Sequence, residues 1–242
     1  MALIDKILKR LQKILKVSVE RTYVYPLKIY SHHQLSFSQE GEDRILDRLF
    51  ERQNEGFYVD IGAHHPQRFS NTYLFYLKGW RGINIDAMPG SMELFKKLRP
   101  RDINIEAAIS DSSEILTYYM FDEPALNGFS EKVSFGRNNR SKNKVVDKRP
   151  IRTLHLSEVL DEHLQVGQEI DFLSIDVEGL DYQVLLSNNW SKYKPKIILI
   201  EELSASLDFV NSSSKIRILL KDEGYELFAK AFNTSFYKLV SI

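Results

Sequence analysis

The sequence predicts an α/β protein with a mostly parallel, doubly wound sheet that ends in an antiparallel hairpin. Three observations support this prediction. Short runs rich in Ile, Val and Phe alternate with helical patterns from about residue 40 onward, as in sheets whose strands are joined by crossover helices. These runs are apolar on both faces, as expected when helices cover both sides of a sheet. The last two runs are separated by Asn233-Thr234-Ser235, which is typical of a hairpin turn.

Five strand–helix units precede the hairpin. The predicted strands are, in chain order, Phe57–Ile61, Gly82–Asp86, Ile103–Ala107, Phe172–Asp176 and Ile197–Glu201. The predicted helices between and before them are Glu42–Glu51, Met92–Leu98, Ser157–His163 and Tyr182–Leu186. The predicted strands of the hairpin are Tyr225–Phe232 and Phe236–Val240.

The composition is that of an ordinary soluble globular protein. The 242 residues are 43% hydrophobic and 27% charged and include no cysteine. Disulfides, thiolate metal sites and a cysteine nucleophile are therefore excluded. The formal net charge is zero, so no overall field attracts nucleic acid, and we expect no nucleic-acid partner. No stretch approaches the roughly 20 consecutive apolar residues of a membrane-spanning helix.

The first 34 residues are predicted to form a basic amphipathic helix and a linker, followed by one α/β domain at residues 35–242. Apolar residues between Ile4 and Leu15 fall on one helical stripe, and most of the neighbouring lysines take the other face. The lysines interrupt the apolar core that a signal peptide would need. Such a helix can lie on an anionic membrane surface. The alternatives are packing on its own domain or on a partner subunit.

A basic segment interrupts the alternation between the third and fourth predicted strands. Residues 131–152 carry eight Lys or Arg residues, opposed only by Glu131 and Asp147. Insertions of this length in compact domains are often lids or binding loops. The alternative is a solvated surface loop.

Candidate ligand-binding residues follow the first two predicted strands. In a doubly wound sheet, ligands bind beyond the carboxyl ends of the strands. Asp60-Ile61-Gly62 lies at such an end, and Gly62 lets the backbone turn sharply and approach a ligand. Asp86 closes the second strand, where a carboxylate can accept hydrogen bonds from both ribose hydroxyls of a nucleoside.

The loop after Gly62 lacks the G-x-G-x-x-G pattern. Ala63, His64, His65 and Pro66 follow the glycine, so the loop offers no glycine nest for a pyrophosphate. This argues against NAD or FAD as the cofactor. A cofactor with a ribose but no phosphate fits better, and S-adenosylmethionine (SAM) is the common one.

Six stretches of the chain, between about Ser36 and Glu202, together resemble the FkbM-type family of SAM-dependent methyltransferases. They are SFSQEGEDRIL (36–46), FYVDIGAHHPQRFSNT (57–72), GWRGINIDAMPGSMELFKKLRP (79–100), INIEAAISD (103–111), IRTLHLSEVL (151–160) and IDFLSIDVEGLDYQVL (170–185). The family typically reads D-I-G-A-N-x-G where this chain reads D-I-G-A-H-H-P. The resemblance implies a Rossmann-like methyltransferase fold with a seven-stranded sheet and a C-terminal hairpin.

The resemblance also implies a reaction, which is transfer of a methyl group from SAM to a hydroxyl of a sugar or glycan. The acceptor would be a surface polysaccharide or a glycosylated natural product. Two alternatives stay open. The chain could be a catalytically silent binding module with this fold, which the altered loop at His64–Pro66 favours. A nicotinamide oxidoreductase is less favoured, because the glycines are missing.

Several cofactor contacts are implied by the same resemblance. In order along SAM, they are Asp60, Gly62 and Ala63 for the methionine part, Asp86 for the ribose, and Ala107, Ala108 and Ser110 for the adenine. Gln39 and Glu42 belong to the entry motif SFSQEGED and would help to close the site.

Candidate catalytic groups lie at the end of the fourth predicted strand and in the loop after the first. A hydroxyl acceptor needs a general base to take its proton. Asp176 and Glu178 point the same way if the strand continues through both, and His64 and His65 can act as bases near pH 7. Asp176 and His65 are the favoured candidates. The alternatives are loop shaping for His64 and helix capping for Glu178.

A divalent cation, Mg²⁺ or Mn²⁺, is a further candidate cofactor. Its ligands would be the oxygen and nitrogen donors at adjacent strand ends, Asp176, Glu178, His64 and Glu201. The basic segment at 131–152 would then contact an acidic or phosphorylated glycan carrier. We expect a cytoplasmic protein, and peripheral contact with the inner membrane face through residues 1–16 and homo-oligomer formation are candidate interactions.

Overall fold

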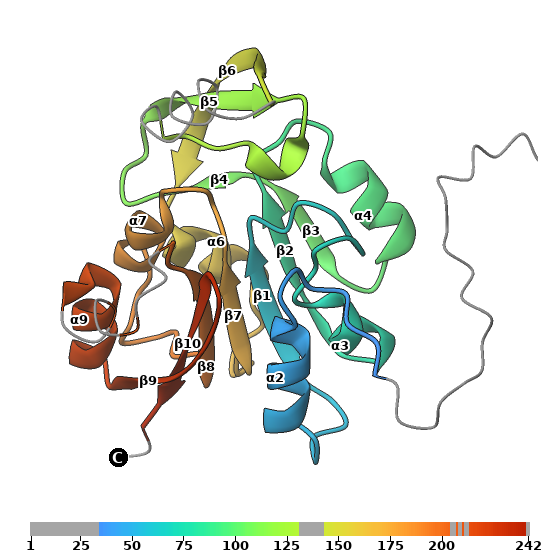
Figure 1. The fold of residues 1–242 in the computed structure, drawn as a ribbon, viewed down its shortest axis with the longest axis vertical. Coiled ribbons are helices and arrows are strands. Elements are labelled where there is room, and N and C mark those ends of the chain that lie inside the picture. The colour runs from blue at the N-terminus through green and yellow to red at the C-terminus, as the bar shows by residue number, and fades with distance from the viewer. Residues whose placement is uncertain (1–33, 131–142, 204–206, 208–209, 211–212, 241–242) are drawn as a thin grey trace, which may run out of the picture. The chain divides into compact units, whose positions relative to one another are not determined.

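The computed structural model describes residues 34–130, 143–203, 207, 210 and 213–240. From Ser36 onward the described residues belong to one compact unit (Figure 1). The predicted basic helix at the N-terminus and residues 131–142 of the basic segment lie outside the described residues. None of the described helices is long and apolar enough to cross a membrane.

A seven-stranded sheet forms the centre of this unit. Its strands are β1 (Phe57–Ile61), β2 (Arg81–Asp86), β3 (Ile103–Glu106), β7 (Phe172–Ile175), β8 (Ile197–Glu201), β9 (Tyr225–Ala231) and β10 (Thr234–Leu239). The order is β3-β2-β1-β7-β8-β10-β9. Strands β3 to β8 in this order are parallel, and β10 pairs antiparallel with both β8 and β9. The predicted mostly parallel sheet with a C-terminal antiparallel hairpin is confirmed.

Helices cover both faces of this sheet. One face carries α2 (Glu42–Leu49) and α3 (Tyr73–Leu77), and the other carries α6 (Leu156–His163), α7 (Asp181–Leu186) and α9 (Lys215–Asp222). A further helix, α4 (Met92–Leu98), packs beside β3. The two layers bury two separate apolar clusters against opposite sides of the strands, which explains why the strands are apolar on both faces.

Side chains of the central strands alternate between these two clusters. Tyr58 and Phe172 lie in the α2–α3 cluster, whereas Val59 and Leu173 lie in the cluster on the opposite face. The next residues, Asp60 and Ser174, therefore return to the α2–α3 face. The register pairs Asp60 directly with Ser174, so two polar side chains meet just below the ends of the central strands.

A second, three-stranded sheet lies above the carboxyl ends of the main strands (Figure 1). It consists of β4 (Ala108–Ile109), β5 (Ile115–Phe121) and β6 (Val145–Leu154), in the order β4-β6-β5, and a 3₁₀ turn, η1 (Pro124–Leu126), follows β5. The sequence did not predict β5 or β6. Residues 145–152 of the predicted basic insertion belong to β6, so the surface-loop alternative is wrong for this part.

The charges and the proline of β6 explain why it resembles a loop in sequence. Five of its ten residues are exposed, and three of these five are Lys or Arg. Pro150 lacks an N–H, but β4 pairs only with Thr153 and Leu154. One side of Pro150 therefore lies at a sheet edge, where a proline is tolerated.

A buried ion pair between Arg99 and Asp102 connects β1, β2 and the loop before α3. Arg99 Nε lies 2.8 Å from Asp102 Oδ2, and both side chains have no exposed surface. Arg99 also donates to the Tyr58 hydroxyl (2.8 Å) and to Thr72 Oγ1 (3.0 Å). Asp102 accepts further hydrogen bonds from Tyr58 (2.8 Å) and Asn84 (3.0 Å). These hydrogen bonds compensate the desolvation of both charges.

Candidate active site

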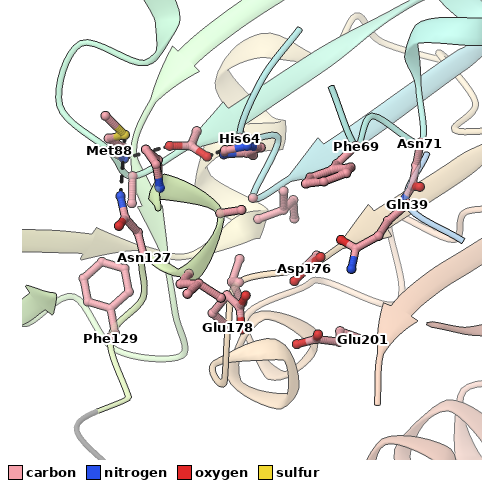
Figure 2. A pocket seen from close by; sticks show the side chains of 18 of the residues that line it. Gln39, His64, Phe69, Asn71, Met88, Asn127, Phe129, Asp176, Glu178 and Glu201 are labelled. Carbon is pink, nitrogen blue, oxygen red and sulfur yellow. Dashed lines mark hydrogen bonds between the residues drawn. The ribbon is translucent and has the colours of Figure 1, made fainter. Parts of the chain in front are cut away.

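A pocket of about 360 Å³ opens at the carboxyl ends of β1, β2, β7 and β8 (Figure 2). This volume falls within the range of roughly 300–1,000 Å³ that is typical of small-molecule sites. The segment after β5 forms the opposite wall, through residues such as Asn127 and Phe129. The pocket lies where a doubly wound sheet is expected to bind its ligand.

Gly62 joins the ends of three strands at this pocket. Its φ of 81° lies in the left-handed region, and a Cβ at this position would lie 1.7 Å from the carbonyl oxygen of Asp176. The Gly62 N–H donates to the carbonyl oxygen of Ile85 over 2.9 Å. Only glycine permits this approach of β1 to β7, so the sequence prediction of a sharp turn here has a structural reason.

Asp86 ends β2 as a buried carboxylate that lines the pocket. Its Oδ1 accepts from the Met88 N–H (2.8 Å) and its Oδ2 from the His64 N–H (2.9 Å). Burial raises the pKa of Asp86, and these hydrogen bonds oppose that effect. Each carboxylate oxygen retains a second lone pair, so the group can still accept hydrogen bonds from a ribose.

Asp43, which does not line the pocket, holds the start of the entry motif in place. The buried Asp43 carboxylate accepts hydrogen bonds from Ser36 Oγ (2.6 Å), the Phe37 N–H (2.7 Å) and Ser38 Oγ (3.0 Å). These bonds fix the segment that leads to Gln39, which lines the pocket.

The motif is also joined to the C-terminal hairpin. Glu40 Oε2 accepts from the Asn233 N–H (2.9 Å), and Glu42 Oε1 accepts from Thr234 Oγ1 (3.2 Å). All four residues line the pocket. One wall of the pocket therefore combines residues from the two ends of the described domain.

Three carboxylates gather at the ends of β7 and β8. Asp176, Glu178 and Glu201 each have a carboxylate oxygen within 4.8 Å of the others. The strand β7 ends at Ile175, so the condition under which strand alternation would point Asp176 and Glu178 the same way is not met. Instead Glu178 takes a positive φ of 56° in a turn, and Asp181 accepts hydrogen bonds from the N–H groups of Val177 and Gly179, both at 3.1 Å.

Asp176 is the member of this cluster that directly follows β7. Solvent reaches its side chain through the pocket, but protein surrounds the carboxylate on its other sides. This burial, together with the negative charges of Glu201 and Glu178, raises the pKa of Asp176 well above its usual value. A carboxylate with a raised pKa is a stronger base than an ordinary one.

The two histidines of the loop have different surroundings. His64 lines the pocket with a positive φ of 52°. Burial, and then the nearby Arg68 and His65, lower the pKa of His64 to about 4, so the ring is neutral at pH 7. Its Nε2 is buried and has no hydrogen-bond partner among the described residues. His65 does not line the pocket, and its Nδ1 accepts from the N–H groups of Gln67 (3.0 Å) and Arg68 (2.9 Å).

The remaining predicted site residues divide into two groups. Ten of the predicted residues line the pocket: Gln39, Glu42, Gly62, His64, Asp86, Ala107, Ala108, Asp176, Glu178 and Glu201. Asp60, Ala63 and Ser110 do not: they lie beneath or beside it. Asp60 accepts from Thr72 Oγ1 (2.8 Å), Ala63 packs in a cluster with α4, and Ser110 donates to Asp111 (3.2 Å). Of the four predicted metal ligands, Asp176, Glu178 and Glu201 lie together, but His64 does not belong to this group.

Several pocket residues were not predicted from the sequence. The main ones are Arg68, Phe69 and Asn71 from the loop after β1, Met88 after β2, and Glu123, Asn127 and Phe129 after β5. Those after β5 depend on the second sheet, which left no recognisable pattern in the sequence. An ion pair between Arg68 and Glu123 (3.0 Å) joins this segment to the loop after β1.

The strand order, the glycine turn after β1 and the buried acid that ends β2 define a Rossmann-like methyltransferase fold. The sequence model of the methyltransferase FkbM domain matches residues 60–227. The chain therefore belongs to the FkbM methyltransferase family, as its sequence motifs predict, and this membership implies SAM as the methyl donor.

Among solved structures, the chain is similar to a TehB-like SAM-dependent methyltransferase from Corynebacterium glutamicum. It is 10% identical to this chain, and the alignment covers 99% of each chain with a TM-score of 0.40. No curated protein matches the sequence.

Proposed function

We propose that this methyltransferase methylates a hydroxyl of a sugar or glycan, such as a surface polysaccharide or a glycosylated natural product. The observation that carries the proposal is the group of carboxylates Asp176, Glu178 and Glu201, within 4.8 Å of one another. They face the same pocket as Gly62 and Asp86. A hydroxyl is a poor nucleophile near neutral pH, so a base at this place suits O-methylation.

The pocket fits SAM as the methyl donor. Asp86 offers lone pairs for the ribose hydroxyls, and Ala107 and Ala108 leave room beside it for the adenine. When bound, SAM supplies a methyl group that its sulfonium already activates. In this assignment Asp60, Ala63 and Ser110 support the walls instead of touching the cofactor.

In the proposed reaction, Asp176 takes the proton of the acceptor hydroxyl. The hydroxyl oxygen forms a bond to the methyl carbon as the bond between that carbon and sulfur breaks. The products are a methyl ether, S-adenosylhomocysteine and a protonated Asp176, which returns its proton to solvent. The neighbouring Glu178 and Glu201 favour protonation of Asp176 electrostatically. A positioned base contributes about 10²–10⁴-fold to such a step.

Asp176→Asn tests this role, because it keeps the shape of the side chain but removes the base. We expect turnover to fall by roughly 10²–10⁴-fold, while the affinity for S-adenosylhomocysteine changes little. Formation of S-adenosylhomocysteine is followed with a panel of glycan acceptors, and the exposed Glu55→Gln serves as the control. Wild-type turnover in Asp176→Asn would exclude Asp176 as the base, and an inert glycan panel with the wild-type protein would exclude the acceptor class.

The same three carboxylates form a candidate Mg²⁺ or Mn²⁺ site, because hard cations prefer oxygen ligands. A bound cation would lower the pKa of the acceptor hydroxyl. Treatment with EDTA distinguishes a metal-bound site from a metal-free Asp176 base. Loss of activity that magnesium or manganese restores supports the metal form, whereas full activity in EDTA supports the metal-free base.

Ligand-induced thermal shift tests the two alternatives to an active methyltransferase. Stabilisation by SAM together with turnover supports the proposal, and stabilisation by SAM without turnover on any acceptor favours a silent module. Stabilisation by NAD instead of SAM would favour an oxidoreductase. Because the chain lacks the glycines of a pyrophosphate nest, we expect no response to NAD.

We further propose that the enzyme works in the cytoplasm and docks on the inner membrane face through residues 1–16. The support is the basic, amphipathic sequence of that segment, where each basic residue contributes about 1 kcal/mol at an anionic surface, screened by salt. Sedimentation with anionic liposomes at low salt compares the full chain with one that lacks residues 1–16. Equal amounts in the supernatant would refute docking.

A further inference from the structure

The side chain of Asn71 faces the pocket with hydrogen-bonding capacity to spare. Asn71 lies in the loop between β1 and α3 and lines the pocket (Figure 2). Its Nδ2 donates to Ser174 Oγ over 3.1 Å. Within the described part of the chain this is the one hydrogen bond of its carboxamide, so one N–H and the carbonyl oxygen remain available to a ligand.

Ser174 holds this carboxamide in one orientation. Ser174 is buried on β7 and pairs in register with Asp60 on β1. Burial raises the pKa of Asp60, and Arg99 and hydrogen bonds from Thr72 and Ser174 oppose that effect. Because the Ser174 hydroxyl directs its one hydrogen to Asp60, its oxygen accepts from Asn71. The nitrogen of the carboxamide therefore faces Ser174, and its orientation is fixed before a ligand arrives.

Asn71 lies at the end of the pocket away from the proposed nucleoside site. Figure 2 shows Met88 and Asn127 on one side of the pocket and Asn71 and Gln39 on the other, with Asp176 between them. In the proposed function, the nucleoside of SAM lies beside Asp86, near Met88. The elongated cofactor then directs its α-amino-acid end toward Asn71.

That end of the cofactor carries a carboxylate and an ammonium group. Arg68 is the one Lys or Arg among the described lining residues, and it is paired with Glu123 at 3.0 Å. Apart from Arg68, the described lining offers the cofactor carboxylate neutral N–H donors, and the carboxamide of Asn71 is one of them. A carboxamide suits a zwitterion, because its N–H can donate to the carboxylate and its oxygen can accept from the ammonium group.

We propose that Asn71, oriented by Ser174, binds the α-amino-acid end of SAM. This inference rests on the proposed cofactor site and assigns a role to Asn71, which lies in the stretch at 57–72 but has no role in the sequence analysis. Asn71 is a binding residue in this arrangement, and Ser174 is a positioning residue that acts through it.

Isothermal titration calorimetry with two ligands tests the inference without any acceptor. The ligands are S-adenosylhomocysteine and 5′-methylthioadenosine, which lacks the amino-acid part. Asn71→Ala should weaken binding of S-adenosylhomocysteine by roughly tenfold or more, because hydrogen bonds to charged groups are lost. Binding of 5′-methylthioadenosine should stay unchanged. Ser174→Ala should show a smaller loss, again for S-adenosylhomocysteine alone.

Two further variants keep the test decisive. Asn71→Asp keeps the shape but places a negative charge beside the cofactor carboxylate, so it should weaken S-adenosylhomocysteine more than Asn71→Ala does. Asn54→Ala, an exposed residue in the loop before β1, should change neither affinity. Folding of each variant is checked by circular dichroism, and Asn71→Asp decides the matter if Asn71→Ala does not fold.

The outcomes separate this inference from the proposed function. If Asn71→Ala binds S-adenosylhomocysteine as the wild type does, or loses both ligands equally, Asn71 does not bind the amino-acid end. If the wild-type protein binds neither ligand, the proposed cofactor site fails and the inference fails with it.

Discussion

Asp176 is placed where its ionised form is unfavourable to the folded protein. Its pKa is raised, first by burial and then by Glu201 and Glu178. The protonated form therefore stabilises the fold. That contribution is complete below the pKa of an unfolded aspartate, about 3.9, and it is lost as the pH rises through the folded-state pKa.

We therefore predict that Asp176→Asn increases the free energy of unfolding at pH 8, because the neutral amide removes the charge repulsion. Near pH 4 the two proteins should be about equally stable. Urea unfolding at both pH values measures the difference. A variant that is no more stable than the wild type at pH 8 would contradict the prediction. A gain in stability together with a loss of turnover is typical of a residue kept for its chemistry.

The identity of Gly62 is set by its positive φ and by its close approach to the Asp176 carbonyl. Gly62→Ala should lower the free energy of unfolding by more than about 2 kcal/mol, since it adds a clash with the Asp176 carbonyl to the cost of a positive φ. Gly90→Ala is the matched control, because its φ of 83° is similar to the 81° of Gly62 but nothing lies within 4 Å of the added Cβ. Equal losses of unfolding free energy in the two variants would show that the close approach of Gly62 to the Asp176 carbonyl does not contribute to the cost.

At the scale of elements, the segment after β5 is positioned by its contact with the turn after β7. A Cβ on Gly128 would lie 2.9 Å from Glu178 Cβ and 3.1 Å from the Glu178 carbonyl oxygen. Gly128→Ala should push these two elements apart. Because both elements line the pocket, we expect weaker binding of S-adenosylhomocysteine, measured by calorimetry. The loss of stability should be smaller than in Gly62→Ala. Wild-type affinity would show that the wall does not need this contact.

The elements also show what the sequence could predict. The seven main strands lie within a few residues of the predicted ranges, because alternation of buried strands and amphipathic helices is visible in the residues themselves. In β5 and β6 the stabilising partner is the other strand, not a periodic apolar face. Pro150 and the many charges of β6 therefore resemble a loop until that pairing is known.

The site residues that could be predicted from the sequence are those at the ends of predicted strands. Gly62, Asp86 and Asp176 stand at strand ends, so finding the strands finds these residues. Asn71 and Asn127 reach the pocket through loops whose course depends on tertiary contacts, such as the hydrogen bond from Asn71 to Ser174. The meeting of Glu178 with Asp176 arises from a turn held by Asp181, which strand alternation alone does not predict.

At the scale of the whole molecule, the buried pair Arg99–Asp102 joins strands β1 and β2 to the loop before α3. We predict that Arg99→Met lowers the free energy of unfolding by about 3–5 kcal/mol, since it leaves the Asp102 carboxylate buried without its cation. Adding Asp102→Asn to this variant should recover part of the loss. Urea unfolding of the three proteins tests this, and a double variant that is less stable than Arg99→Met would contradict it.

The bonds from Glu40 to Asn233 and from Glu42 to Thr234 span 193 and 192 residues of the chain. At synthesis rates of about 5–20 residues per second, roughly 10–40 s separate the appearance of the two partners on the ribosome. Within that interval β1, β2 and β7 are all synthesised before the hairpin that completes the pocket wall. Ligand binding stabilises only a state that can bind. We therefore expect the cellular supply of SAM to influence how much enzyme survives after release from the ribosome, and not how the growing chain folds.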